Sequence, residues 1–230
     1  MMKKSYAGWV FNLFYIIAVV IAVVDWIALA GQKKSIDYFA KPGVIIALLI
    51  WLALNGNLSG HLIWFFIGLL FSLAGDVFLL LPKEQFNAGL VSFLLAHVAY
   101  IIGFNDILPP GNLVSISLIL IITITACQIF RSISTGLERS NNSKMKVPFL
   151  FYSITISLMV LSACLTLVKG DWIAGPALLV SGGAVLFFLS DTLLAWNRFV
   201  TPIPNAKLQV RVTYHSGQLL IVLGAFLHFT

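Results

Sequence analysis

The stretch that decides the fold extends from His61 to Leu81 and reads HLIWFFIGLLFSLAGDVFLLL. After its first residue it contains one ionisable side chain, Asp76, and no proline. An α-helix rises 1.5 Å per residue, so about 20 apolar residues cross the hydrocarbon core of a bilayer. We therefore predict a transmembrane helix over these residues.

Seven further apolar runs predict helices over Trp9–Ala30, Pro42–Leu54, Phe86–Phe104, Leu113–Phe130, Pro148–Val168, Ile173–Trp196 and Val212–Phe229. The breaks between them are rich in proline, glycine and asparagine, which favour turns. The run Pro42–Leu54 has only 13 residues, so its helix either extends into the flanking loops or spans only part of the bilayer. The sequence predicts an all-α, polytopic transmembrane bundle of about eight helices, forming a single domain over residues 1–230.

The composition excludes most soluble classes. Hydrophobic residues make up 60% of the chain and charged residues 10%, whereas soluble domains have about 45–50% and 25%. The net charge of +6 therefore does not indicate nucleic-acid binding, because Lys and Arg beside spans report topology first. The two cysteines, Cys127 and Cys164, lie in apolar runs. We expect both to be buried, and we expect no disulfide, no metal and no other cofactor.

The positive charges predict an orientation. Eleven of the 14 Lys and Arg residues fall after the first, third, fifth and seventh predicted helices: Lys33, Lys34, Lys41, Lys83, Arg131, Arg139, Lys144, Lys146, Arg198, Lys207 and Arg211. The positive-inside rule places these loops in the cytoplasm and both termini outside. Compact loops favour a bacterial inner (cell) membrane.

Polar residues inside the spans are the candidate functional residues, because they are costly in hydrocarbon. Asp76 and Asp191 each precede the cytoplasmic end of a predicted helix by five residues, which puts both about 7–8 Å inside the boundary. Tyr214 and Gln218, spaced i,i+4 on one helix face, lie roughly 4–10 Å deep. We expect these four side chains to converge on one layer, where Asp76 and Asp191 share a lipid-facing cavity; the alternative is a structural pair of aspartates bonded across helices.

Two further polar positions admit a structural interpretation. His97 lies about 16 Å from Phe86 along its helix, near mid-membrane, with Tyr100 on the same face. It is either a satisfied hydrogen-bonding residue or part of the site. Asp25 lies close to Lys33 and Lys34, and we expect its carboxylate to reach the interface.

Several short motifs occur in a specific order: Lys41-Pro42; AGDVFLL at 74–80; Phe86, Gly89, Leu90, Phe93, Ala96, His97 and Tyr100; SDTLLA at 190–195 continuing to Arg198-Phe199; and Tyr214 followed by QLLI at 218–221. At these residues the chain resembles the lysoplasmalogenase family, the YhhN-like membrane proteins. The predicted helices over Trp9–Ala30, Leu113–Phe130 and Pro148–Val168 match only in length and order.

The resemblance implies hydrolysis of the vinyl ether bond of lysoplasmalogens to a fatty aldehyde and glycerophosphocholine or glycerophosphoethanolamine. The substrate would be a lysophospholipid taken from the membrane. Protonation of an enol ether carbon needs a general acid, and the resulting oxocarbenium ion needs a carboxylate and a water molecule. Asp76 and Asp191 would share these roles, and the sequence does not say which is the acid. The supporting residues would be Tyr214 and Gln218 on the water or glycerol hydroxyl, His97 and Tyr100 below the pocket, and Lys41 or Arg198 on the phosphate.

Other interpretations stay open at this point. A proton-coupled transporter would also use intramembrane Asp and His, but would spread polar residues through the full depth of the bilayer. An intramembrane aspartyl protease is disfavoured because position 73, in the motif before Asp76, is Leu. Haem binding by His97 and His215 is disfavoured by their different depths. The Asp-bearing and Lys-Pro-bearing helices recur four helices apart, which predicts a degenerate four-plus-four repeat.

Overall fold

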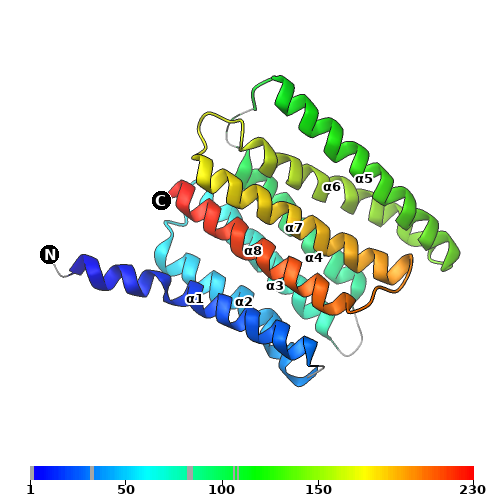
Figure 1. The fold of residues 1–230 in the computed structure, drawn as a ribbon, viewed down its shortest axis with the longest axis horizontal. Coiled ribbons are helices and arrows are strands. Elements are labelled where there is room, and N and C mark those ends of the chain that lie inside the picture. Colours follow the sequence, from blue (N-terminus) through cyan, green and yellow to red (C-terminus); the bar gives the residue numbers. More distant parts are fainter. Residues whose placement is uncertain (1–2, 32–33, 82–84, 106, 108) are drawn as a thin grey trace. The chain divides into compact units, whose positions relative to one another are not determined.

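The computed structural model describes residues 3–31, 34–81, 85–105, 107 and 109–230. They form eight α-helices and a short 3₁₀ turn, η1 (Figure 1): α1 Lys3–Ala30, α2 Lys34–Asn55, α3 Leu62–Leu80, α4 Phe86–Phe104, α5 Leu113–Arg139, η1 Ser143–Met145, α6 Lys146–Leu165, α7 Ala174–Phe199 and α8 Ala206–Phe229. Within these described ranges there is no strand. All eight helices are long and apolar enough to cross a membrane. The predicted all-α transmembrane fold is confirmed.

The second helix is longer than the sequence predicted. The prediction began at Pro42, because proline favours the first turn of a helix, whereas α2 begins at Lys34 and has 22 residues with Pro42 in its interior. Its apolar window, Tyr38–Asn55, has the length of a full span. The first alternative, extension into the flanking segment, is therefore confirmed by length and composition.

Several cations that were assigned to loops lie on helices instead. α5 ends at Arg139, nine residues beyond the predicted end at Phe130, and therefore contains Arg131. Arg198 lies in the last turn of α7, and Arg211 lies in the first turns of α8. Apolarity marks only the hydrocarbon core, while backbone hydrogen bonding continues a helix into the interface. Lys33 and Lys83 lie outside the described residues.

The chain divides into two compact units. The first comprises Met1–Gly103 with Ala225–Thr230, and the second comprises Phe104–Gly224. In the first unit α2 packs against both α1 and α3; in the second, α5, α6 and α7 pack against one another. The boundary between the units lies at the end of α4, which is where the predicted four-plus-four repeat would divide; only the end of α8 departs from this division. The repeat itself and the single domain remain predictions.

Aromatic side chains form the core of the first unit. The ring of Trp51, which is 1% exposed, lies 5.0 Å from that of Tyr15 and 4.6 Å from that of Phe226. Tyr100 of α4 packs so closely on Gly68 of α3 that a Cβ atom at position 68 would overlap its ring. The glycine therefore brings α4 against α3, the helix that carries Asp76.

A close backbone contact joins α7 and α8 in the second unit. A Cβ atom on Gly183 would lie 2.7 Å from the carbonyl oxygen of Gly217 and 2.8 Å from the backbone nitrogen of Ile221. Small residues at such crossings let helices in membranes approach closely. The neighbouring Gly182 is exposed, and a Cβ atom there would meet nothing within 4 Å.

These adjacent glycines form a matched pair for a stability test. We expect Gly183→Ala to lower the free energy of unfolding by about 1–3 kcal/mol, because the added methyl group forces the helices apart. Gly182→Ala should leave it unchanged or raise it by up to about 1 kcal/mol, since alanine favours helix. Equilibrium unfolding of both purified variants in detergent measures the difference. Equal effects would contradict the close contact.

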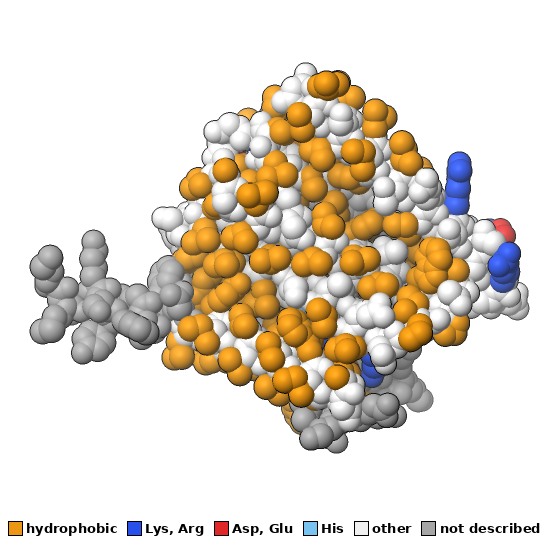
Figure 2. All heavy atoms as spheres, viewed as in Figure 1, with side chains coloured by type: hydrophobic (Ala, Val, Ile, Leu, Met, Phe, Trp, Pro, Cys, Tyr) orange, Lys and Arg blue, Asp and Glu red, His pale blue; other side chains and the backbone are white. Residues whose placement is uncertain are grey.

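The outer surface is apolar, as a bilayer requires. Hydrophobic side chains cover most of the face shown in Figure 2, and few Lys, Arg, Asp or Glu side chains interrupt them. α5 is the extreme case, because only 6% of its apolar window is buried. The protein is an integral membrane protein, and α5 is the helix whose apolar window is least covered by the rest of the described chain.

Candidate functional site

Asp76 forms a buried ion pair in the first unit. Its Oδ1 atom lies 3.1 Å from Nζ of Lys41; Asp76 is fully buried and Lys41 is 8% exposed. The packing of α2 against α3 brings the two side chains together. Lys41 is therefore inside α2, where its ammonium group contacts Asp76, and not in a loop between helices as the sequence predicted.

His97 and Tyr100 lie in the same unit as this pair. Both side chains are fully buried on α4. The Tyr100 ring stacks on Phe65 of α3 at a centroid distance of 5.8 Å and covers Gly68, two turns before Asp76. The face of α4 that carries Tyr100 is thus the one that packs on α3.

Asp191 has its own polar partner in the second unit. The hydroxyl group of Tyr152 on α6 donates a hydrogen bond to Oδ2 of Asp191 on α7. Tyr152 is 5% exposed and Asp191 is half-buried. The two side chains line a cavity of about 20 Å³ together with Ser153, Ser157 and Thr192 among others. A cavity of that volume has room for one water molecule, and its mainly apolar wall includes the hydroxyl and carboxyl groups named above.

Tyr214 and Gln218 are buried on α8 in the second unit, as predicted for one helix face. The Tyr214 ring meets Phe187 of α7 edge-on, at a centroid distance of 5.2 Å. Next to Asp191, the hydroxyl group of Ser190 donates to the carbonyl oxygen of Val210 at 3.1 Å, which ties α7 to α8 at the level of the carboxyl group.

Arg198 is exposed in the last turn of α7. Its guanidinium carbon lies 5.7 Å from the centre of the Phe199 ring, a cation–π arrangement. An exposed arginine at a helix end suits an anionic headgroup.

The predicted residues thus fall into two sets. Lys41 and Asp76 are in contact, with His97 and Tyr100 in the same unit. Asp191, Arg198, Tyr214 and Gln218 belong to the second unit. That Asp76 and Asp191 act on one substrate stays a prediction.

Tyr152 is the functional candidate that sequence reasoning missed. It lies six residues from the start of α6 at Lys146, about 9 Å along the helix, close to the depth inferred for Asp191. The criterion that identified the two aspartates, a polar residue a few ångströms inside the end of an apolar span, would have identified this tyrosine also. The sequence also placed Arg211 in a loop, whereas this side chain is on α8 and only 5% exposed.

Two other expectations are wrong. Asp25 does not reach the interface, because its side chain is fully buried. Cys127 is exposed, whereas Cys164 is buried as expected. Among the described residues, no group of three or more His, Cys, Asp or Glu side chains could hold a metal ion.

Comparison with known proteins gives a consistent result. The profile of the YhhN family matches residues 36–225. The chain is 29% identical to mouse lysoplasmalogenase TMEM86B over 187 residues, which are 80% of this chain and 72% of the relative. The pig protein of the same name is 29% identical over 94% of this chain and 85% of the relative. A lysoplasmalogenase of Mycobacterium bovis is 28% identical over 71% and 60%, respectively. No solved structure matches the chain significantly.

Proposed function

This chain belongs to the YhhN family, and from that premise we propose that it is a lysoplasmalogenase, which hydrolyses the vinyl ether bond of lysoplasmalogens. The products would be a fatty aldehyde and glycerophosphocholine or glycerophosphoethanolamine. Relatives from mammals and mycobacteria carry the name lysoplasmalogenase. The observation that carries the proposal is that carboxyl groups on α3 and α7 sit within apolar spans with polar partners of their own.

The reaction sets specific demands on those groups. An acid must protonate the β-carbon of the enol ether, which gives an oxocarbenium ion. A water molecule then adds to this ion, and the hemiacetal that results collapses to aldehyde and alcohol. A negative charge near the cation lowers the barrier, and a base must accept the proton of the water.

Asp76 is the proposed stabiliser of the oxocarbenium ion. The ion pair at 3.1 Å involves its ionised carboxylate, whose charge is fixed in place before substrate binds. A preorganised charge in a water-poor site acts more strongly than one in solvent. In this scheme Lys41 holds Asp76 in position, which differs from the phosphate-binding role first expected for it.

Asp191 is the proposed acid and base. It would give its proton to the β-carbon and then accept one from the attacking water, so that the carboxyl group is regenerated. Two features support this role: the hydroxyl group of Tyr152 orients the carboxyl group, and the adjoining cavity of about 20 Å³ suits a single water molecule.

The remaining predicted residues would act around the glycerophosphate end. Arg198, exposed at the end of α7, is the proposed partner of the phosphate. Tyr214 and Gln218 would hydrogen-bond the glycerol hydroxyl group, and His97 and Tyr100 would support the helix that carries Asp76. We place the site on the cytoplasmic side of a bacterial inner membrane with both termini outside, which reporter fusions to the C-terminus would check.

The direct test is release of fatty aldehyde by the purified protein in detergent. We expect release from a 1-alkenyl lysophosphatidylethanolamine, and none from the 1-alkyl analogue of equal chain length, because an alkyl ether has no double bond to protonate. Aldehyde is measured by mass spectrometry. No release by folded protein, together with proton-driven solute uptake into proteoliposomes, would favour the transporter alternative.

A further inference from the structure

A long groove separates α5 from α6 in the second unit. Its volume is about 270 Å³, and its walls include Ile122 and Phe130 of α5 and Leu150, Ile154, Leu158 and Leu161 of α6. The two helices lie side by side (Figure 1), yet α5 is almost unburied along its span. The groove is therefore open to the hydrocarbon of the bilayer.

The walls of the groove contain few polar groups that would need a hydrogen-bond partner from a ligand. The hydroxyl group of Ser157 donates to the backbone carbonyl of Ser153 at 2.6 Å, a bond within α6 that satisfies the hydroxyl locally. The groove thus presents an apolar surface, which suits a hydrocarbon chain rather than a polar solute.

The groove adjoins the water-sized cavity at Asp191 about midway along its length. Ala126, Ser153 and Ser157 line both. At this junction the ring of Phe130, in the groove, stacks on that of Phe149, in the cavity, with centroids 6.4 Å apart. Most of the wall of each space is apolar, and the Tyr152 and Asp191 side chains lie on the cavity side.

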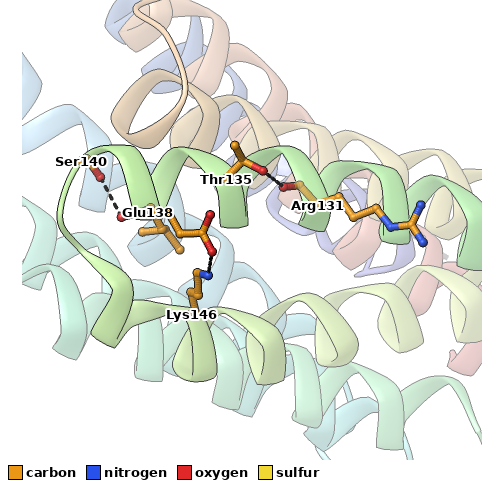
Figure 3. A network of polar contacts seen from close by, with 6 residues as sticks. Arg131, Thr135, Glu138, Ser140 and Lys146 are labelled. Carbon is orange, nitrogen blue, oxygen red and sulfur yellow. Dashed lines mark hydrogen bonds and ion pairs between the residues drawn. The ribbon is translucent and has the colours of Figure 1, made fainter.

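An ion pair also joins the two helices that form the walls of the groove. Lys146, the first residue of α6, forms an ion pair with Glu138 in the last turn of α5 (Figure 3). In the same view the hydroxyl group of Thr135 donates to the carbonyl oxygen of Arg131 at 3.0 Å within α5. The ion pair thus ties α5 to α6 beyond the end of the groove that Phe130 and Leu150 mark.

We propose that this α5–α6 groove binds the alkenyl chain of the lysolipid and so brings its ether-linked end to Tyr152 and Asp191. The identity of the chain rests on the proposed function. From Phe130 to Ile122 the groove follows α5 for about 12 Å, and from Leu150 to Leu161 it follows α6 for about 16 Å. That is roughly half the hydrocarbon thickness of a bilayer, so the far end of a long chain would remain in lipid.

The groove would act by position rather than by hydrophobic affinity. Moving a chain from bilayer hydrocarbon to an apolar groove gains little free energy, because both surroundings are apolar. A chain aligned in the groove has its vinyl ether fixed in depth, however, and misplacement by about 1 Å can lower a rate about 10²-fold. The groove therefore predicts discrimination by chain length in kcat/KM.

Binding can be tested without turnover. The probe is a 1-O-alkyl lysophosphatidylethanolamine with a photoreactive diazirine midway along its chain, which wild-type protein in detergent cannot hydrolyse under the proposed mechanism. We expect adducts on the groove-lining residues of α5 and α6, competed by unlabelled lysolipid and not by diacyl phospholipid. Adducts spread over the outward face of α5, or equal competition by diacyl phospholipid, would overturn the proposal.

Two threonines of α5 provide a matched pair for kinetics. Both are exposed, but Thr123 lines the groove and Thr125, two residues on and on another face, does not. We expect Thr123→Phe to lower kcat/KM about tenfold for a hexadecenyl substrate and to spare an octenyl one; Thr125→Phe should change neither. Equal effects of the two variants would contradict the groove. If wild type releases no aldehyde, the function fails while the adducts still decide the binding site.

Discussion

Asp76→Asn is expected to release fatty aldehyde about 10²–10⁴-fold more slowly than wild type, and Asp191→Asn should lose activity to a similar extent. The amide keeps the shape of each side chain but cannot ionise or donate a carboxyl proton. Steady-state aldehyde release in detergent, at saturating lysoplasmalogen, measures both losses.

The matched control is Asp25→Asn, which alters another fully buried aspartate in the first unit and should retain activity. If Asp76→Asn and Asp191→Asn both turned over at the wild-type rate in folded protein, the carboxyl mechanism would be wrong.

Lys41→Met is expected to lower the free energy of unfolding by about 3–5 kcal/mol, because it leaves the carboxylate of Asp76 buried without its ammonium partner. The double variant Lys41→Met/Asp76→Asn should recover most of that loss, since no charge then remains to be compensated. Unfolding in denaturing detergent can be followed by tryptophan fluorescence, as the chain has six Trp residues.

The control for this cycle is Lys146→Met, which removes the ion pair with Glu138 at a partly exposed position. That pair should contribute no more than about 1 kcal/mol. Additive effects of Lys41→Met and Asp76→Asn would show that the two side chains do not depend on one another.

Sequence reasoning predicts helices well where apolarity and helix length coincide. The predicted bounds of α4, Phe86 and Phe104, are those of the structure, because turn-forming and polar residues flank the run on both sides. At α2 the prediction missed the two helical turns before Pro42, because the residues there are too polar to continue the apolar run. A lysine in a span is costly in isolation, and its compensation by Asp76 on the next helix is invisible in a local window.

The site was only partly predictable for a related reason. The criterion of depth found Asp76 and Asp191, but the Tyr152–Asp191 bond joins residues 39 positions apart, and no spacing encodes that contact. The exposure of Cys127 was missed because helix faces toward lipid and toward protein are both apolar. Polarity, which marks the outside of a soluble protein, carries no such information in a bilayer.

The Lys41–Asp76 pair also bears on how the chain enters the membrane during synthesis. A single Lys or Asp costs up to about 2.5–3.5 kcal/mol in a helix leaving the translocon, the full cost applying at the helix centre. Only residues 56–61 separate α2 from α3, and the two helices pack together. They are thus suited to leave the translocon as a hairpin whose charges are already neutralised, so that neither helix has to carry its charge into lipid alone.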